Sequence, residues 1–87
     1  MIERATTICN DLGLHARPAA QLVRMASGFA SEIWLERDGQ SVNAKSIMGV
    51  MMLAAEQGAR VTLRASGPDE AEALAALVAL IERGFGE

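Results

Sequence analysis

Hydrophobic residues recur along this chain with two different periods, and the order in which the periods alternate limits the folds open to it. Residues 60–66 (RVTLRAS) alternate between apolar and polar, which predicts a strand with one buried face. Residues 69–83 follow a helical period instead, which predicts an amphipathic helix ended by Gly84. Asp69 and Glu72 have the spacing of a capping box at its start. The expected buried positions are Val61, Leu63, Ala65, Leu74, Leu77, Val78 and Ile81.

The same two patterns alternate through the preceding residues. The sequence predicts strands over residues 2–8, 31–37 and 40–44, and helices beginning at Ala16 and Ile47. Asp38 and Gly39 favour a two-residue hairpin turn between the second and third strands. Gly28 is placed to end the first helix. The predicted order of elements is therefore β-α-β-β-α-β-α.

This order predicts an α+β fold in a single domain, residues 1–87. Each predicted helix has one apolar stripe, so the helices need a sheet to cover. We expect a four-stranded, mostly antiparallel sheet with three helices on one face and with Trp34, Thr62 and Arg64 on the solvated face. A ferredoxin-like arrangement has a similar order of elements, and periodicity alone leaves that alternative open.

Charge and composition exclude several classes of function. The net charge is −3 and the basic residues are scattered, so we expect no nucleic-acid-binding face. The longest apolar runs, IMGVMMLAA and ALAALVALI, are far shorter than the roughly 20 residues of a membrane helix, so we expect no membrane insertion. One cysteine, Cys9, and one histidine cannot form a structural zinc site, and we expect neither metal nor cofactor. Cys9 also permits no internal disulfide, which favours the cytoplasm in a chain without a signal-like stretch after Met1.

The only histidine, His15, stands in the segment DLGLHARPAA, where a loop turns into the first predicted helix. Pro18 supports a helix that begins at Ala16, because proline is tolerated in the first turn. The free N–H groups of Ala16 and Arg17 are then expected to point outward beside the imidazole. Such amides bind phosphate, and an arginine adds charge-assisted hydrogen bonds to phosphate oxygens.

Two interpretations of His15 follow from these residues. A neutral imidazole is a nucleophile, so the segment combines a nucleophile with a binding site for the phosphoryl group that it receives. Alternatively, His15 is a loop residue that caps a backbone amide, which is the simpler interpretation of a lone histidine beside an arginine.

The segments GLHARPAA and AKSIMGVMML together resemble those of the HPr family, the histidine-containing phosphocarrier proteins of the bacterial phosphotransferase system. The resemblance covers essentially the whole chain. It implies an open-faced β-sandwich, in which a four-stranded antiparallel sheet lies under three helices, and it decides against the ferredoxin-like order. It also implies that Nδ1 of His15 accepts a phosphoryl group from Enzyme I and passes it to an Enzyme IIA protein. Arg17 is then the arginine that helps hold the phosphoryl group, and the protein is a relay rather than an enzyme.

The second motif carries further implications of the resemblance. Ser46 matches a regulatory serine that a dedicated HPr kinase/phosphorylase modifies in many bacteria, although an N-cap for the next helix is the simpler interpretation. A short helix cannot hide all the apolar residues that follow, so some must be exposed. We expect a docking surface for the partner proteins comprising Ala16, Ala20, Ile47, Met48 and Met51.

Several alternatives remain open at this stage. The acidic residues and the alanine-rich last helix are also similar to those of NPr, the paralogue of the nitrogen-related branch. Ala16 stands where some relatives carry a hydroxyl residue, so only its backbone amide is expected to contact phosphate. A second function is a regulatory protein-binding module whose contacts are switched by phosphorylation at His15 and Ser46. A third is a structural domain with an incidental histidine. We expect a monomer in each case.

Overall fold

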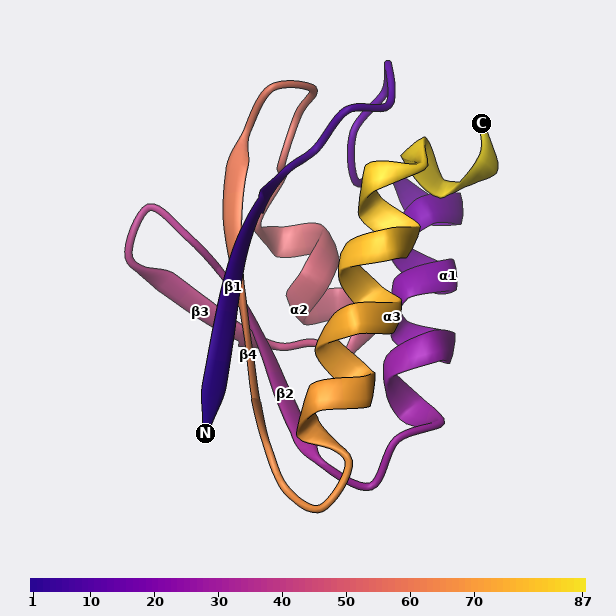
Figure 1. Cartoon of the computed structure of the whole chain (residues 1–87). Coiled ribbons are helices and arrows are strands. Elements are labelled where there is room, and N and C mark those ends of the chain that lie inside the picture. Colours follow the sequence, from indigo (N-terminus) through magenta and orange to yellow (C-terminus); the bar gives the residue numbers. More distant parts are fainter.

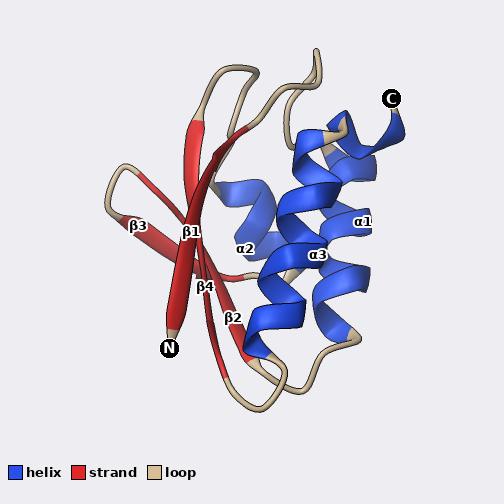
Figure 2. Cartoon of the chain, in the orientation of Figure 1, coloured by secondary structure: helices blue, strands red, loops and turns tan.

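Two layers make up the molecule, an antiparallel sheet and the helices that cover one of its faces (Figure 1 and Figure 2). The computed structural model describes residues 1–87. The strands are β1 (Ile2–Thr7), β2 (Glu32–Arg37), β3 (Gln40–Asn43) and β4 (Arg60–Ser66). The helices are α1 (Ala16–Ser27), α2 (Ile47–Met52) and α3 (Glu70–Glu82), followed by a short 3-10 helix, η1 (Gly84–Gly86). The predicted order and fold class are confirmed, and each predicted boundary lies within a residue of the observed one.

The topology of the sheet decides between the two predicted arrangements. The strands are ordered β1-β4-β2-β3, and every neighbouring pair is antiparallel. A split βαβ sheet would contain a parallel pair, so the ferredoxin-like alternative is wrong. Leu35 of β2 lies opposite Leu63 of β4, which puts the apolar side chains of both strands on one face. Asp38 and Gly39, with φ of 52° and 83°, form the predicted hairpin turn between β2 and β3.

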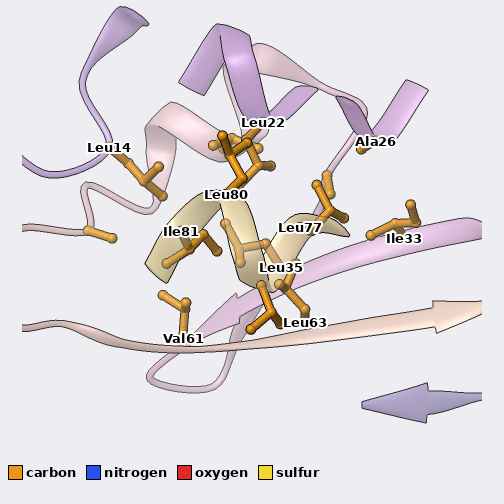
Figure 3. Packing of buried hydrophobic residues seen from close by; sticks show 14 of the residues in the cluster. Leu14, Leu22, Ala26, Ile33, Leu35, Val61, Leu63, Leu77, Leu80 and Ile81 are labelled. Carbon is orange, nitrogen blue, oxygen red and sulfur yellow. The ribbon is translucent and has the colours of Figure 1, made fainter. Parts of the chain in front are cut away.

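The hydrophobic core fills the space between the sheet and the helices (Figure 3). Every position predicted to face inward on β4 and α3 is buried. The first helix adds Ala19, Leu22 and Ala26 to the same cluster. Leu77 and Ile81 of α3 point toward the sheet in Figure 3, and α3 packs mainly against β1 and β4. None of the helices reaches the length and apolar character that a membrane crossing requires.

The opposite face of the sheet is polar and partly solvated, as predicted. Trp34, Thr62 and Arg64 are all partly exposed there. Arg64 of β4 bonds to Glu36 of β2, and its Nη2 lies 3.8 Å from Oε2 of Glu3 on β1. The hydrogen bond that Arg64 donates to Glu36 raises the pKa of Arg64 above its ordinary value. These ion pairs join three strands without involving the helices.

The predicted capping box at the start of α3 is wrong. The Asp69 carboxylate makes no bond to its own helix. It accepts hydrogen bonds from the backbone N–H of Ala30 at 2.8 Å and of Ser31 at 2.9 Å, and from the Ser31 hydroxyl. The turn before α3 approaches the α1–β2 loop so closely that only glycine fits at position 67. A Cβ at Gly67 would lie 2.7 Å from the Ser31 Cα. Asp69 therefore ties two distant loops together, which local spacing cannot reveal.

Asp69→Asn is expected to lower the melting temperature at pH 7, because the carboxylate accepts three hydrogen bonds in the folded state. These bonds, first among them the one from the Ser31 hydroxyl, hold the pKa of Asp69 below its ordinary value. A depressed carboxyl pKa stabilises the fold above the unfolded-state pKa of about 3.9, and this contribution disappears as pH falls through the folded-state pKa. Thermal unfolding of both proteins from pH 7 to pH 2 tests this. A difference between them that is unchanged at the lowest pH would contradict it.

Candidate functional site

His15 is the residue immediately before α1, and its side chain is not a helix cap. Its backbone is extended, with φ −76° and ψ −173°, and its side chain makes no hydrogen bond to the backbone of the first turn. The simpler sequence interpretation, an imidazole that caps an amide, is therefore wrong. The side chain is 37% exposed, so a partner protein can reach the ring.

The C-terminal residue, Glu87, holds one nitrogen of this ring. Oε2 of Glu87 lies 3.1 Å from Nε2 of His15. Oε1 of the same carboxylate accepts a hydrogen bond of 3.1 Å from Nδ2 of Asn10, which also donates to the carbonyl of Gly13 at 2.8 Å. In Figure 1 the C-terminus accordingly lies at the same end of the molecule as the start of α1. Sequence reasoning missed Glu87.

The contact with Glu87 defines which nitrogen of His15 is free. A carboxylate only accepts hydrogen bonds, so the bond requires the ring proton to be on Nε2. In the neutral ring, Nδ1 then carries the lone pair. Nδ1 has no hydrogen-bond partner in the structure, whereas Nε2 is held in place. The arrangement presents Nδ1 as the nucleophilic atom.

The first turn of α1 provides two backbone donors next to the ring. The first bond back to His15 comes from the N–H of Ala19, at 3.0 Å to the His15 carbonyl. Pro18 has no N–H, so the amides of Ala16 and Arg17 are the free donors of this helix end, and both residues are exposed. The first turn contains no acidic residue, and the Arg17 guanidinium forms no ion pair. No side chain of the first turn therefore competes with an anion, and the carboxylate of Glu87 lies on the Nε2 side of the ring.

The loop before His15 is held against the segment that follows α2. Leu14 is buried, and its N–H donates to the carbonyl of Ala55 at 2.8 Å. Gly13 has φ +67°, and a Cβ on it would lie 2.3 Å from the Ala55 oxygen and 2.8 Å from the Cα of Glu56. This close approach of two backbones fixes the position of the residue that leads into His15.

Gly13→Ala is therefore expected to displace the His15 loop and to slow the phosphorylation of His15 that the family resemblance implies. The left-handed φ alone costs an alanine about 1–2 kcal/mol of stability, and the clash with Ala55 adds to that cost. Gly58→Ala is the matched control, because Gly58 has φ +90° and open space around its Cβ position. Urea unfolding and phosphorylation rates of both variants test this. Equal effects of the two substitutions would contradict the role of the close contact.

The second motif forms α2, which packs against α1. Ser46 is its N-cap, since the Ser46 hydroxyl accepts a hydrogen bond of 3.2 Å from the Gly49 N–H. Val50 is the only residue of the helix that is buried. The remaining large apolar side chains are exposed by 41% to 70%, and they are Ile47, Met48, Met51 and Met52.

The predicted docking residues lie on these two packed helices. On α1, Ala16 is exposed and Ala20 is half-buried. The exposed apolar surface is larger than the predicted set, because Met52 of α2 and Leu12 of the His15 loop are 67% and 73% exposed. The surface next to the candidate site thus contains long, flexible apolar side chains. Such side chains suit a protein that contacts several partners in turn.

The Cys9 thiol does not belong to a metal-binding cluster. The Cys9 thiol is exposed and donates to the carbonyl of Ile81 at 3.3 Å, at the end of α3. No group of three or more His, Cys, Asp or Glu side chains is arranged to hold a metal ion.

Comparison with known proteins gives a consistent result. Residues 2–83 match the sequence model of the family described as "PTS HPr component phosphorylation site". The chain is similar to the phosphocarrier protein HPr of Cupriavidus necator, with 58% identity over 100% of this chain and 98% of that protein. Its structure is similar to the crystal structure of HPr-C-His from Thermoanaerobacter tengcongensis, with a TM-score of 0.97, 57% identity, and coverage of 100% and 98%. The HPr dimer from the same organism, also 57% identical and covered over 100% of both chains, gives a TM-score of 0.81.

Proposed function

This chain belongs to the HPr family, and we propose that Nδ1 of His15 is the atom on which it carries the phosphoryl group. The protein is a phosphoryl carrier of the phosphotransferase system, taking the group from Enzyme I and handing it to Enzyme IIA proteins. It is a carrier in a relay rather than a catalyst. The observation that supports His15 as the acceptor is its half-exposed ring, with Nε2 held by Glu87 and Nδ1 unpartnered beside two free amides.

The chemistry proposed at this site is a direct transfer between two proteins. The Nδ1 lone pair of His15 attacks the phosphorus, a P–N bond forms, and the bond to the donor atom on Enzyme I breaks with its electron pair leaving to that donor. The amides of Ala16 and Arg17 and the Arg17 guanidinium receive the phosphoryl oxygens. The Nε2 proton stays on the ring, hydrogen-bonded to Glu87, so the attack by Nδ1 needs no general base.

The site is built to release the group as readily as it accepts it. At this end of α1, the only groups placed to hold a phosphoryl group are the two backbone amides and the guanidinium of Arg17. The ring is partly exposed, and the Ala16 side chain offers no hydroxyl. Weak binding of the product keeps the phosphohistidine reactive toward an Enzyme IIA protein.

Glu87→Gln is expected to weaken the hydrogen bond to Nε2 and to slow phosphoryl transfer by up to about tenfold. A rate change of this size corresponds to the loss of one hydrogen bond of ~1 kcal/mol or slightly more. The fraction of His15 with its proton on Nε2 should fall, because an amide side chain accepts a hydrogen bond less strongly than a carboxylate. Nitrogen-15 NMR of the ring and single-turnover transfer rates measure the two effects. Glu82→Gln, on the exposed end of α3, is the control. A Glu87→Gln protein with the wild-type ring spectrum would contradict the proposed role.

We further propose that the working unit is a monomer in the cytoplasm. Support comes from the completeness of the site within one chain, since His15, both amides and Glu87 all belong to the same protomer. A relative of 57% identity forms a dimer, so the assembly state is to be measured by sedimentation at the concentrations used for transfer. Transfer rates proportional to monomer concentration are expected. A dimer with full activity and an inactive monomer would contradict the proposal.

The proposed function is tested by following labelled phosphate through the relay. The chain is incubated with Enzyme I, phosphoenolpyruvate carrying ³²P, and an Enzyme IIA protein. A carrier becomes labelled and passes the label to the Enzyme IIA protein. A regulatory binding module becomes labelled but retains the label, and a structural domain with an incidental histidine is never labelled. Either of the last two results would overturn the proposal.

A further inference from the structure

Arg37, the last residue of β2, is a cation at a position whose side chain faces the helices. It shares the strand face of Ile33 and Leu35, which are both buried in the core. Its own side chain is only 20% exposed. A charge at such a position requires partners, since an unpaired cation cannot be buried at low cost. None of the contacts described above at the candidate site involves this residue.

The partners of Arg37 lie in the short segment directly after α2. Nη1 donates to the carbonyl of Leu53 at 3.2 Å and to that of Ala54 at 2.8 Å. Nη2 donates to Oε1 of Glu56 at 2.6 Å. The pKa of Glu56 lies below its ordinary value. The largest cause is a hydrogen bond to the backbone of Glu56 itself, and the hydrogen bond from Arg37 is the next. The contact with Asp38 is weaker, at 3.5 Å to a carboxylate that is 88% exposed.

These contacts support a turn that is unfavourable for its sequence. Ala54 has φ +50°, in the left-handed region that alanine rarely adopts. It follows the C-cap of α2, Leu53, whose carbonyl has no partner within the helix. The guanidinium of Arg37 satisfies both carbonyls and places a positive charge at the C-terminal end of the helix dipole. A planar fork that reaches two carbonyls and a carboxylate at once is specific to arginine.

The segment held by Arg37 is the one on which the His15 loop rests. Ala55, between Ala54 and Glu56, is buried and accepts the 2.8 Å hydrogen bond from the N–H of Leu14. Leu14 immediately precedes His15. Arg37 and the His15 loop therefore both bind the segment 53–56, Arg37 through its guanidinium and the loop through the N–H of Leu14.

We propose that Arg37 is a positioning residue for phosphoryl transfer. By fixing residues 53–56, it sets both the end of the docking helix α2 and the loop that presents His15. This proposal rests on the proposed function, because it takes His15 as the acceptor, and on the sequence prediction that α2 is part of a docking surface. Arg37 touches neither the ring nor the phosphoryl group and acts only through the segment between them.

The test compares Arg37→Met with Arg64→Met. Each variant removes a partly buried arginine of the sheet that pairs with a glutamate, but Arg64 lies on the opposite face and has no contact with residues 53–56. Hydrogen exchange of the Leu14 amide is measured in the free proteins, under conditions where urea unfolding shows both to be fully folded. We expect Arg37→Met to accelerate this exchange by about tenfold, the value of one charge-assisted hydrogen bond of ~1.4 kcal/mol or more, and Arg64→Met to leave it unchanged.

Transfer kinetics provide the second measurement. Arg37→Met is expected to raise the KM for Enzyme I by roughly three- to tenfold with a smaller change in kcat. The substitution displaces the surface that docks on Enzyme I, whereas the reacting groups at His15 are unchanged. Arg37→Lys should recover part of both effects, since a lysine reaches one carbonyl but not all three acceptors. Unchanged Leu14 exchange, or equal kinetic effects of Arg37→Met and Arg64→Met, would overturn the proposal. The exchange measurement involves no phosphoryl group, so it gives its answer even if another residue proves to be the acceptor.

Discussion

His15→Ala is expected to abolish acid-labile phosphorylation of the protein by Enzyme I and to leave its fold intact. The chain has one histidine, so no second imidazole can take over the phosphoryl group. The fold survives because the His15 side chain caps no backbone group and is 37% exposed. Its one interaction is the contact with Glu87, and exposed pairs of this kind contribute only about 0–1 kcal/mol.

The measurement is incorporation of ³²P from phosphoenolpyruvate through Enzyme I, with circular dichroism and thermal unfolding recorded on the same samples. Glu87→Gln is the matched control, because it weakens the same contact but keeps the imidazole. It must still be labelled, only more slowly. Acid-labile label on folded His15→Ala would show that the phosphoryl group is carried elsewhere.

Phosphorylation of Ser46 is expected to raise the KM for Enzyme I by roughly tenfold or more, because a charge that must lose water when a partner docks costs several kcal/mol. Ser46 precedes Ile47 and Met48, which are 41% and 70% exposed on the proposed docking surface. The fold should tolerate the modification. Ser46 is the N-cap of α2, whose first turn has no acidic residue, and a negative charge there stabilises a helix by about 0.3–1 kcal/mol.

Two substitutions separate charge from capping at Ser46. Ser46→Asp adds about one negative charge where phosphoserine carries about −1.5 to −2, so its effect on KM should be the smaller. Ser46→Asn keeps an N-cap side chain without charge and should keep the wild-type KM. The kinetics are measured against carrier concentration alongside thermal stability. A phosphorylated protein with unchanged KM, or one that loses activity only as it unfolds, would contradict the docking explanation.

Local signals in the sequence were sufficient to predict the fold. Alternation in β4 and the stripe of α3 identify the two layers, and both patterns depend only on residues close in the chain. Pro18 located the start of α1, and Ser46 located the start of α2. The element order predicted a mostly antiparallel sheet, but only the family resemblance decided against the ferredoxin-like arrangement, because periodicity does not report which strands are neighbours.

The parts of the site that the sequence did not predict depend on contacts between distant residues. Glu87 and His15 are 72 positions apart, and no spacing rule connects them. The two glycines near the end of the sequence, Gly84 and Gly86, were the available signal that the chain turns there. Their φ angles of 65° and 76° direct the chain back toward α1 around the buried Phe85. Asp69 was assigned to a local capping box for the same reason, since its partner Ser31 is 38 positions away.

The exposed apolar surface of α2 and the His15 loop is larger than the predicted set of docking residues. A short apolar helix has too few turns to show which side it buries, so exposure depends on what it packs against. In α2 only Val50 is buried, which leaves Met52 exposed with the predicted residues. Leu12 was missed because single apolar residues in loops carry no periodic signal.

Phosphorus-31 and nitrogen-15 NMR of the phosphorylated chain tests the central claim most directly. The protein is labelled at its single histidine and phosphorylated by Enzyme I and phosphoenolpyruvate. We predict a one-bond coupling between phosphorus and Nδ1 of His15, with a proton retained on Nε2 beside Glu87. A phosphoryl group on Nε2, or on any residue other than His15, would contradict the account.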